Sequence, residues 1–377
     1  MALWVEKATL PSDGLPIYSG NYWGLNGSSQ PPGAFVNSTF YLTGGESIGA
    51  SGTNEFETYS YTPSNNTWTA IRDDSNNLVL VPHIRKNTTG ASVNGLFCTL
   101  AKDPAASGTS QPTYLDYYTP STKTWTTISP PSSASTVRFN VEYNCCIGYG
   151  TRLYSFGGIA GGSGGSFQRR GYWYDFSNDT WGLTSEWTSV TSSRAYQQGG
   201  CVYGSKIYLF GGAIGSIFGG NFNTVLVYDP VADTWTSGGT LPNAMRFAIT
   251  GAIGSRIWVT GKQGGTGKTL EYDPATQAFI DHTEADHLTD GWGGAGGSDG
   301  SNLYHACPGG NWQNQYSHAD YSSHFSDNLE NAAMLQLLPA HRFTKDIALT
   351  GSGSLGADAE IAVTANFGPY VGAIVIV

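Results

Sequence analysis

The sequence has few charged residues, and only a minority of these are basic. Asp, Glu, Lys and Arg make up 12% of its 377 residues, and Lys and Arg together number 18. The basic residues form no dense patch, whereas binding to the phosphate backbone of a nucleic acid needs clustered cations. A net charge of −10 also opposes such binding. The composition therefore predicts that nucleic acid is not a partner.

Long apolar runs and helical patterns are also missing. No run of apolar residues is long enough to span a bilayer. No long stretch places apolar residues at helical spacing. Residues 1–7 lack the charged-then-apolar pattern of a signal peptide. We expect almost no helix, no membrane span and no export by a signal peptide.

Cysteine is scarce. The five cysteines are Cys98, Cys145, Cys146, Cys201 and Cys307. Their number is odd and their spacing matches no zinc pattern. Because Cys98, Cys201 and Cys307 lie in or beside apolar, strand-like runs, we expect buried, reduced core residues.

Glycine and aromatic residues, by contrast, are abundant. The chain contains 51 Gly, 22 Tyr, 16 Phe and 11 Trp. Aromatic and β-branched residues separated by Gly, Ser, Thr and Asn are typical of many short strands joined by tight turns. A chain of this length commonly forms more than one domain. A closed array of repeats is the main exception, because each repeat shares its core with its neighbours.

One pattern recurs along the chain: Tyr, a small or acidic residue, Pro or Phe, four residues, and then Trp or Phe. Its copies begin at Tyr61, Tyr118, Tyr174, Tyr228 and Tyr272 and end at Trp68, Trp125, Trp181, Trp235 and Phe279. We expect the Tyr and the final aromatic residue to lie on two strands around a turn, with their rings filling the space between repeats.

A second pattern lies upstream, where an apolar strand ends in Gly-Gly. The full copies end at Gly45, Gly158 and Gly212, and each precedes the Tyr of its repeat by the same interval. Successive repeats are about 50 residues apart. Over residues 1–343 these features resemble the Kelch repeat family. The resemblance implies an all-β fold in which four-stranded blades surround a central channel.

The two ends of the repeat array complement each other. The sixth copy, from about residue 302, lacks the Tyr-Asp-Pro element and the following Trp. Trp4 is followed by Leu10-Pro11 at the interval that separates Trp235 from Leu241-Pro242. We therefore predict a six-bladed Kelch-type β-propeller in which the N-terminal strand completes the sixth blade, leaving only short, protected edges.

Residues 344–377 fall outside the repeat and form a predicted C-terminal β extension. Left unpaired, its apolar end at residues 371–377 would favour aggregation. The alternatives are a hairpin packed on the propeller and a segment for docking or oligomerisation. Residues 346–355 are similar to Gly/Ser-rich β segments in minor tail proteins of long-tailed phages that infect actinobacteria. That resemblance implies a virion tail location and other tail proteins as partners of residues 344–377, with self-association and an extracellular location as alternatives.

Two groups of residues invite a chemical interpretation. Residues 261–269 look like a phosphate-binding loop, but Lys262 stands where the pattern needs Gly, and a hairpin is expected in place of a helix. His305, His318 and His324 belong to a His-rich segment and are the candidate metal ligands. The competing interpretation of the His-rich segment is a set of polar loops without a metal. We predict no cofactor.

Enzymes also use this scaffold. The copper site of Kelch-type oxidases needs a Tyr linked to Cys, a second Tyr and two His, a set that cannot be placed on this chain. His83, Arg85, Tyr304, His305 and His318 could supply the proton-abstracting group of a polysaccharide lyase, although no spacing demands it. A carbohydrate-active or copper-type oxidoreductase or lyase therefore stays an alternative, as does a protein-interaction Kelch domain.

Binding is the simplest function for the predicted propeller, because loops gather on its faces. Aromatic rings flanked by Asn, Gln and Asp suit the apolar faces and hydroxyl groups of sugars. The candidate ligand-binding residues are Trp173, Phe218, Phe222, Trp292, Trp312 and Tyr316. The prediction is a non-catalytic module that recognises a host-surface glycan or another tail protein; the alternative is that many of these rings fill the blades.

Overall fold

We analysed a computed structural model of the chain. It describes residues 3–9, 32–43, 57–83, 88–102, 113–129, 141–160, 166–196, 198–214, 220, 222–263, 266–282, 295–306 and 333–338. The chain divides into two compact units, Met1–Ala340 and His341–Val377. The predicted extension, residues 344–377, lies outside the described residues.

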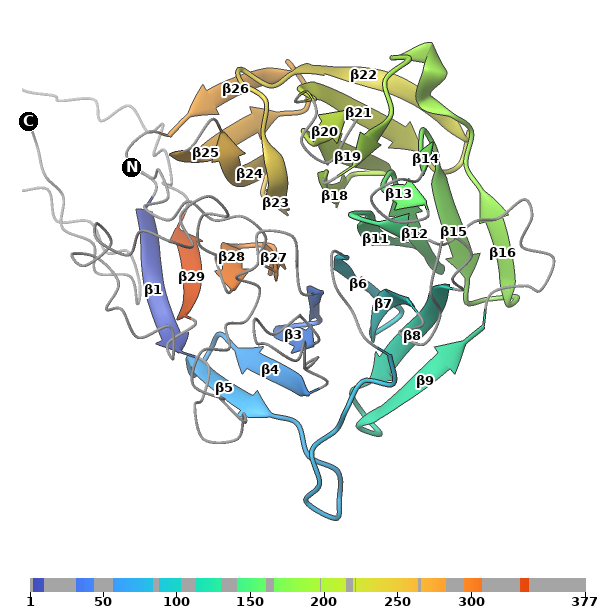
Figure 1. The fold of residues 1–377 in the computed structure, drawn as a ribbon. Helices are drawn as coiled ribbons and strands as arrows, with labels where there is room; N and C mark the ends of the chain where they lie inside the picture. The colour runs from blue at the N-terminus through green and yellow to red at the C-terminus, as the bar shows by residue number, and fades with distance from the viewer. Residues whose placement is uncertain are drawn as a thin grey trace, which may run out of the picture. The chain divides into compact units, whose positions relative to one another are not determined.

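The first unit is an all-β propeller whose strands form four-stranded antiparallel sheets around a common centre (Figure 1). Five sheets are each built from consecutive parts of the chain. Sheet 1 contains β2 (Gly33–Val36), β3 (Thr39–Thr43), β4 (Thr58–Thr62) and β5 (Thr67–Ala70), and sheet 2 contains β6 (Gly90–Val93), β7 (Leu96–Lys102), β8 (Thr113–Thr119) and β9 (Thr124–Ile128). Sheet 3 contains β11 (Cys145–Tyr149), β12 (Arg152–Phe156), β15 (Gly171–Asp175) and β16 (Thr180–Leu183). Sheet 4 contains β18 (Gly199–Tyr203), β19 (Lys206–Phe210), β21 (Thr224–Asp229) and β22 (Thr234–Thr240), and sheet 5 contains β23 (Arg246–Ile253), β24 (Arg256–Gln263), β25 (Thr266–Asp273) and β26 (Ala278–Asp281).

Sheet 6 joins the two ends of this unit. It contains β27 (Ala295–Ser298), β28 (Leu303–Ala306), β29 (Ala333–Leu338) and the N-terminal strand β1 (Leu3–Thr9), in the order β1-β29-β28-β27. Trp4 lies opposite Leu337, which in turn lies opposite Leu303. In sheet 4, Trp235 lies opposite Tyr228 and Tyr228 opposite Ile207. Trp4 therefore takes the register of the fourth-strand Trp.

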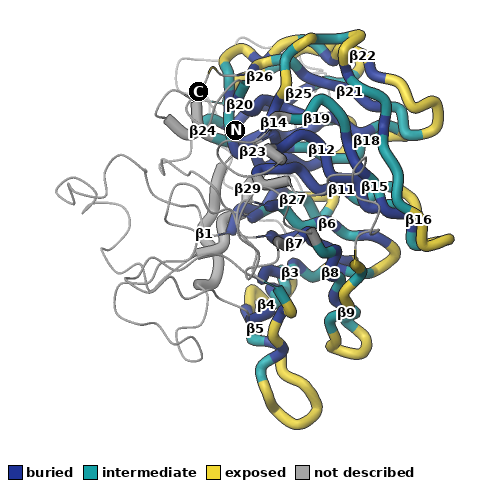
Figure 2. The backbone as a smooth tube through the Cα atoms, turned by 45° about the vertical axis from the view of Figure 1, so that its right-hand side comes forward, coloured by how far each residue is buried: buried dark blue, intermediate teal, exposed yellow. Residues whose placement is uncertain are grey.

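The repeated aromatic residues face each other across the third and fourth strands, as predicted. Tyr228 is paired with Trp235, and their ring centroids are 4.7 Å apart. The equivalent pairs are Tyr61–Trp68, Tyr118–Trp125, Tyr174–Trp181 and Tyr272–Phe279. Burial follows the strands, whereas the turns that join the third and fourth strands are exposed (Figure 2). The repeat thus supplies both the turn and the core of each sheet.

Neighbouring sheets approach closely near the centre. A Cβ added to Gly148 of β11 would lie 1.8 Å from the backbone oxygen of Ser92 in β6. No side chain fits in that gap, so glycine sets the distance between these innermost strands. Further out, tyrosine rings fill the space between sheets, as Tyr154 of β12 and Tyr228 of β21 do at 5.9 Å.

Several other expectations can be compared with the structure. Cys98, Cys145, Cys146 and Cys201 are free thiols, the first three buried, while Cys307 lies outside the described residues. The apparent phosphate loop is a hairpin between β24 and β25, as expected, with Gln263 opposite Thr266. Helix in the described part of the chain is limited to a 3₁₀ turn at Trp187–Ser189. No helix among the described residues is long and apolar enough to cross a membrane.

Candidate binding face and its polar clusters

The long connections of the propeller emerge at one end of the sheets. At the opposite end, two-residue turns such as Asn94-Gly95 and Gly204-Ser205 join the first and second strands. The long connections carry two small sheets of their own. The first is formed by β10 (Val141–Glu142), β13 (Ile159–Ala160) and β14 (Ser166–Phe167), and the second by β17 (Ala195–Tyr196) and β20 (Ala213–Ile214). We call this end the long-connection face; its added structure makes it the candidate binding face.

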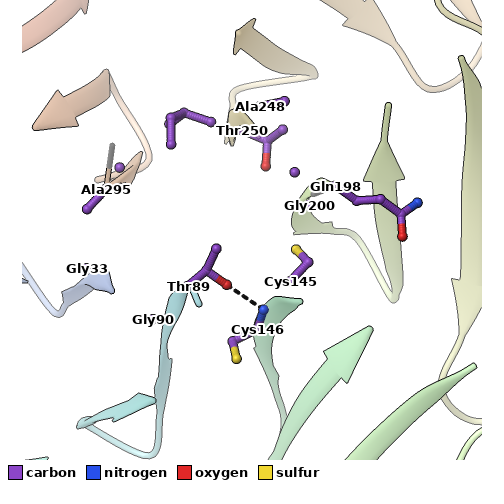
Figure 3. Close-up of a pocket in the computed structure, with 13 residues that line it drawn as sticks. Gly33, Thr89, Gly90, Cys145, Cys146, Gln198, Gly200, Ala248, Thr250 and Ala295 are labelled. Atoms are coloured by element: carbon purple, nitrogen blue, oxygen red, sulfur yellow. Dashed lines mark hydrogen bonds between the residues drawn. The ribbon is translucent and has the colours of Figure 1, made fainter. Parts of the chain in front are cut away.

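A cavity lies at the centre, where the innermost strands of all six sheets meet (Figure 3). It is lined by Gly33, Thr89, Gly90, Cys145, Cys146, Gln198, Gly199, Gly200, Ala248, Ile249, Thr250, Ala295 and Gly296. Its volume is about 50 Å³. Since a water molecule needs roughly 10–15 Å³ by this measure, the cavity has room for a few waters but not for a sugar ring.

Two buried amides belong to this region: Gln198, which lines the cavity, and Asn144, which precedes the lining residue Cys145. Gln198 is 3% exposed, and neither its Nε2 nor its Oε1 has a hydrogen-bond partner among the described residues. Asn144 donates from Nδ2 to Ser155 Oγ at 2.7 Å, but within the same part of the chain its Oδ1 has no partner. Figure 3 shows the Gln198 amide pointing away from the cavity, and its Oε1 lies against Gly157 at the end of β12. Because buried amides cost free energy when unsatisfied, these positions need bound water or another polar group.

Three aromatic side chains gather where the chain enters the innermost strands. The rings of Tyr196 and Phe247 lie 6.1 Å and 6.4 Å from that of Tyr143, and all three side chains are buried. Tyr143 and Phe247 both have left-handed backbone conformations, with φ of 60° and 51°. Such conformations are costly for bulky residues and persist only where the surroundings enforce them. The cluster therefore fixes the paths of the connections that enter β11 and β23.

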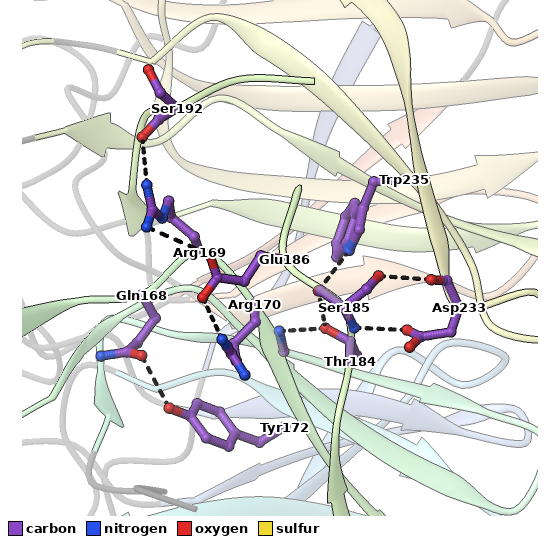
Figure 4. Close-up of polar contacts among 11 residues, drawn as sticks. Gln168, Arg169, Arg170, Tyr172, Thr184, Ser185, Glu186, Ser192, Asp233 and Trp235 are labelled. Atoms are coloured by element: carbon purple, nitrogen blue, oxygen red, sulfur yellow. Dashed lines mark hydrogen bonds and ion pairs between the residues drawn. The ribbon is translucent and has the colours of Figure 1, made fainter. Parts of the chain in front are cut away.

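A cluster of charges lies on the long-connection face beside sheets 3 and 4 (Figure 4). Arg169 and Arg170, between β14 and β15, both pair with Glu186, which follows β16. Arg169 Nη1 also donates to the backbone oxygen of Ser192 at 3.4 Å. The hydrogen bond from Arg170 is the main cause that lowers the pKa of Glu186, with further contributions from the charges of Arg169 and Arg194, while burial opposes the shift. Glu186 is therefore an ionised carboxylate at neutral pH.

A second polar cluster lies in sheet 2. His83 Nδ1 lies 2.9 Å from Oδ2 of Asp116, whose side chain is fully buried. Thr127 donates to the other carboxylate oxygen of Asp116, at 2.5 Å. The His83 ring stacks on Tyr114 with a centroid distance of 4.2 Å. This arrangement holds the imidazole in one orientation, as a structural ion pair or a proton-transfer group would require.

Two of the six predicted ligand-binding residues, Trp173 and Phe222, lie among the described residues. Trp173 lies on β15, where the guanidinium of Arg152 sits 4.1 Å from its ring and its Nε1 donates to the Leu183 oxygen at 3.2 Å. Phe222 is 4% exposed and belongs to a core cluster with Trp187 and Leu226, so its ring contributes to packing. Phe218, Trp292, Trp312 and Tyr316 lie outside the described residues.

One of the three predicted metal ligands, His305, lies among the described residues. His305 is a buried residue of β28, 6% exposed, while His318 and His324 lie outside the described ranges. Within those ranges no group of three or more His, Cys, Asp or Glu side chains could hold a metal ion.

Sequence reasoning missed the partners of the charged clusters. Arg169 and Arg170 lie just before the candidate residue Trp173, but nothing in the sequence pointed to Glu186. Likewise, Asp116 is one of many polar residues in strands, and its pairing with His83 depends on how the connection to β6 runs. Burial is the signal that distinguishes Asp116, and it appears only in the folded chain.

The comparisons with known proteins bear on the fold. The segment 194–242 contains all four strands of sheet 4, together with Gly211-Gly212, Tyr228 and Trp235. Residues 194–242 match a Kelch motif. This Kelch motif confirms the repeat at one of its copies.

Solved structures extend the likeness beyond the Kelch motif. The one described as "Structure of YjhT" has 12% sequence identity and a TM-score of 0.53, covering 68% of this chain and 84% of its own. At that identity the match establishes the propeller fold alone and gives no information about activity. No curated protein matches the sequence.

Proposed function

We propose that the six sheets are six blades of a Kelch-type propeller and that β1 closes the ring. The cavity lined by all six innermost strands supports this interpretation, as does the register of Trp4 opposite Leu337. A variant lacking residues 1–9 should then melt at a lower temperature, and a peptide of residues 1–12 should restore its stability while a scrambled peptide does not. An unchanged melting temperature would contradict closure by β1.

We further propose that the propeller is a non-catalytic binding module that recognises a glycan through its long-connection face. The observation that carries this proposal is the Arg169–Glu186–Arg170 cluster, in which charged side chains about one-third exposed are held in place on that face. Gln168, which accepts a hydrogen bond from Tyr172 at 3.0 Å, adds an amide of the kind that binds sugar hydroxyls.

The setting that we propose is the tail of a phage virion, where the protein would contact the host surface. The Gly/Ser-rich β segment at residues 346–355 and the apolar end at residues 371–377 support docking of residues 344–377 to other tail proteins. Extracellular placement, self-association through the same segment and a protein ligand in place of a glycan are the competing proposals. A tagged protein incubated with tail proteins should lose its partners when residues 344–377 are removed.

Glycan recognition is tested with an array of neutral and acidic saccharides probed with the full chain. We expect binding that Arg170→Gln reduces and that Arg72→Gln, on an exposed turn, leaves unchanged. If the protein binds no saccharide on the array, the glycan proposal is wrong and a protein ligand is favoured.

The enzyme alternative rests on a specific observation, the orientation of His83 by buried Asp116. A lyase or oxidase on this scaffold would need such a proton-transfer group. Screening polysaccharides for newly formed unsaturated or oxidised ends, with His83→Gln as the comparison, would support this alternative if activity appears and depends on His83.

A further inference from the structure

The charged cluster on the long-connection face already holds a carboxylate. Arg170 Nη2 pairs with Oε1 of Glu186, and Arg169 Nη2 lies 3.5 Å from Oε2. Each oxygen of the carboxylate therefore faces one guanidinium group, as Figure 4 shows. Planar guanidinium groups match carboxylates in shape and hydrogen-bonding pattern, so the cluster is built for this group.

The balance of charge in this cluster differs from that of the other ion pairs in the described part of the chain. Exposed Arg194, on the connection to sheet 4, also acts on Glu186. Two cations, Arg169 and Arg170, thus flank one carboxylate, and the charge of Arg194 also lowers its pKa. By contrast, Arg256 in sheet 5 pairs with both Glu271 and Asp273. In a chain of net charge −10, a local excess of cations attracts anions to this part of the face.

The backbone around the two arginines is fixed in place. The oxygen of Arg169 accepts from the Trp187 N–H at 3.0 Å, and the oxygen of Arg170 accepts from the Gly157 N–H at 3.4 Å. The side chains of Arg169 and Arg170 are 28% and 34% exposed. A solute can therefore reach guanidinium groups that are already ordered, which reduces the entropy lost on binding.

We propose that Arg169 and Arg170 bind the carboxylate of an acidic saccharide, and that Glu186 fills this position when the saccharide is absent. The inference deepens the proposed glycan binding and rests on it. The amide of Gln168, next to Arg169 in the chain, is placed to contact a ring hydroxyl. Because Glu186 competes with the ligand for the same donors, its removal should strengthen binding.

The test uses the full-length protein and isothermal titration calorimetry. The probes are trigalacturonic acid, its methyl ester as the matched neutral ligand, and a sulfated disaccharide as the alternative anion. We expect Arg170→Gln to weaken trigalacturonate binding by about tenfold or more, since a charge-assisted pair is lost. Glu186→Gln should tighten it several-fold. Binding of the methyl ester should stay the same in both variants, and Arg72→Gln serves as the control for total charge.

The outcomes separate the two proposals. Equal affinity for the acid and its ester, or an unchanged affinity in Arg170→Gln, overturns the carboxylate site while glycan binding stands. Tighter binding of the sulfated disaccharide overturns the choice of carboxylate. Failure of every saccharide to bind overturns both proposals. Thermal unfolding of each variant checks the fold, and Arg170→Lys, which keeps the charge without the planar fork, should bind with intermediate affinity.

Discussion

The ring of Tyr61 in β4 lies 6.2 Å from the ring of Tyr304 in β28. These residues belong to sheet 1 and sheet 6, which stand at opposite ends of the repeat array. The contact repeats the one that Tyr228 makes with Tyr154, where sheet 4 packs on sheet 3. Sheets 6 and 1 therefore pack by the same tyrosine contact as sheets that are consecutive in the chain.

Replacing Asp233 by Ala should destabilise the protein by about 2–3 kcal/mol, because two hydrogen bonds and a favourable turn residue are lost together. Asp233 has φ of 52° and accepts from the Tyr228 hydroxyl at 2.7 Å and the Ser185 N–H at 2.8 Å. Lys123 occupies the same turn position in sheet 2, with φ of 54°. Lys123→Ala therefore provides the matched control, with an expected loss of no more than about 0.5 kcal/mol, because Lys and Ala bear the same steric penalty at positive φ. Urea unfolding measures both, and equal losses would contradict a role for the two hydrogen bonds.

Replacing His83 by Ala should lower the free energy of unfolding by about 2 kcal/mol, because it removes a partner of the fully buried carboxylate of Asp116. His282 offers a matched comparison. Its Nε2 lies 3.0 Å from Glu271, whose side chain is 19% exposed and also pairs with Arg256. His282→Ala should therefore cost less, about 1 kcal/mol. A loss for His282→Ala as large as that for His83→Ala would show that burial of the carboxylate is not what matters.

The contribution of Asp175 should depend on pH. Burial opposes ionisation, but hydrogen bonds from Ser177, Arg152 and Thr151 outweigh it and hold the pKa of Asp175 well below its usual range. A carboxyl whose pKa is depressed on folding stabilises the protein above the unfolded pKa, about 3.9, and loses this effect as the pH falls toward the folded pKa. The stability difference between the wild type and Asp175→Asn should thus be constant near neutral pH and shrink below about pH 4. Denaturant unfolding across this range measures it, and a difference independent of pH would contradict the assignment.

The buried cysteines should resist alkylation in the native protein. Burial raises the pKa of Cys146 to about 11, and burial raises the pKa of Cys145 well above its usual range. Since the thiolate is the reacting species, iodoacetamide at pH 8 should leave both unmodified until denaturant is added. Mass spectrometry of peptides reports each site separately. Modification of either cysteine within minutes in the native protein would show that these thiols are accessible.

Kelch repeats could be predicted because their residues act locally. Tyr228 and Trp235 face each other across one turn, and the spacing between them fixes that register whatever surrounds them. The hairpin at residues 261–268 was predictable for the same reason. The partner of Arg170 was not, since Glu186 reaches it only after β15 and β16 have paired and the following connection has turned back over sheet 3.

The amino-acid sequence by itself determined the strand and turn pattern, the repeat and the pairing of its aromatic residues, because these follow from steric preferences and hydrophobicity over a few residues. Only the tertiary structure decided which polar residues meet. It placed Asp116 in the interior beside His83, left the Gln198 amide without a partner among the described residues, and gathered Arg169 and Arg170 around Glu186. Such contacts depend on the packing of one sheet against the next and on the paths of the long connections, which no short stretch of sequence encodes.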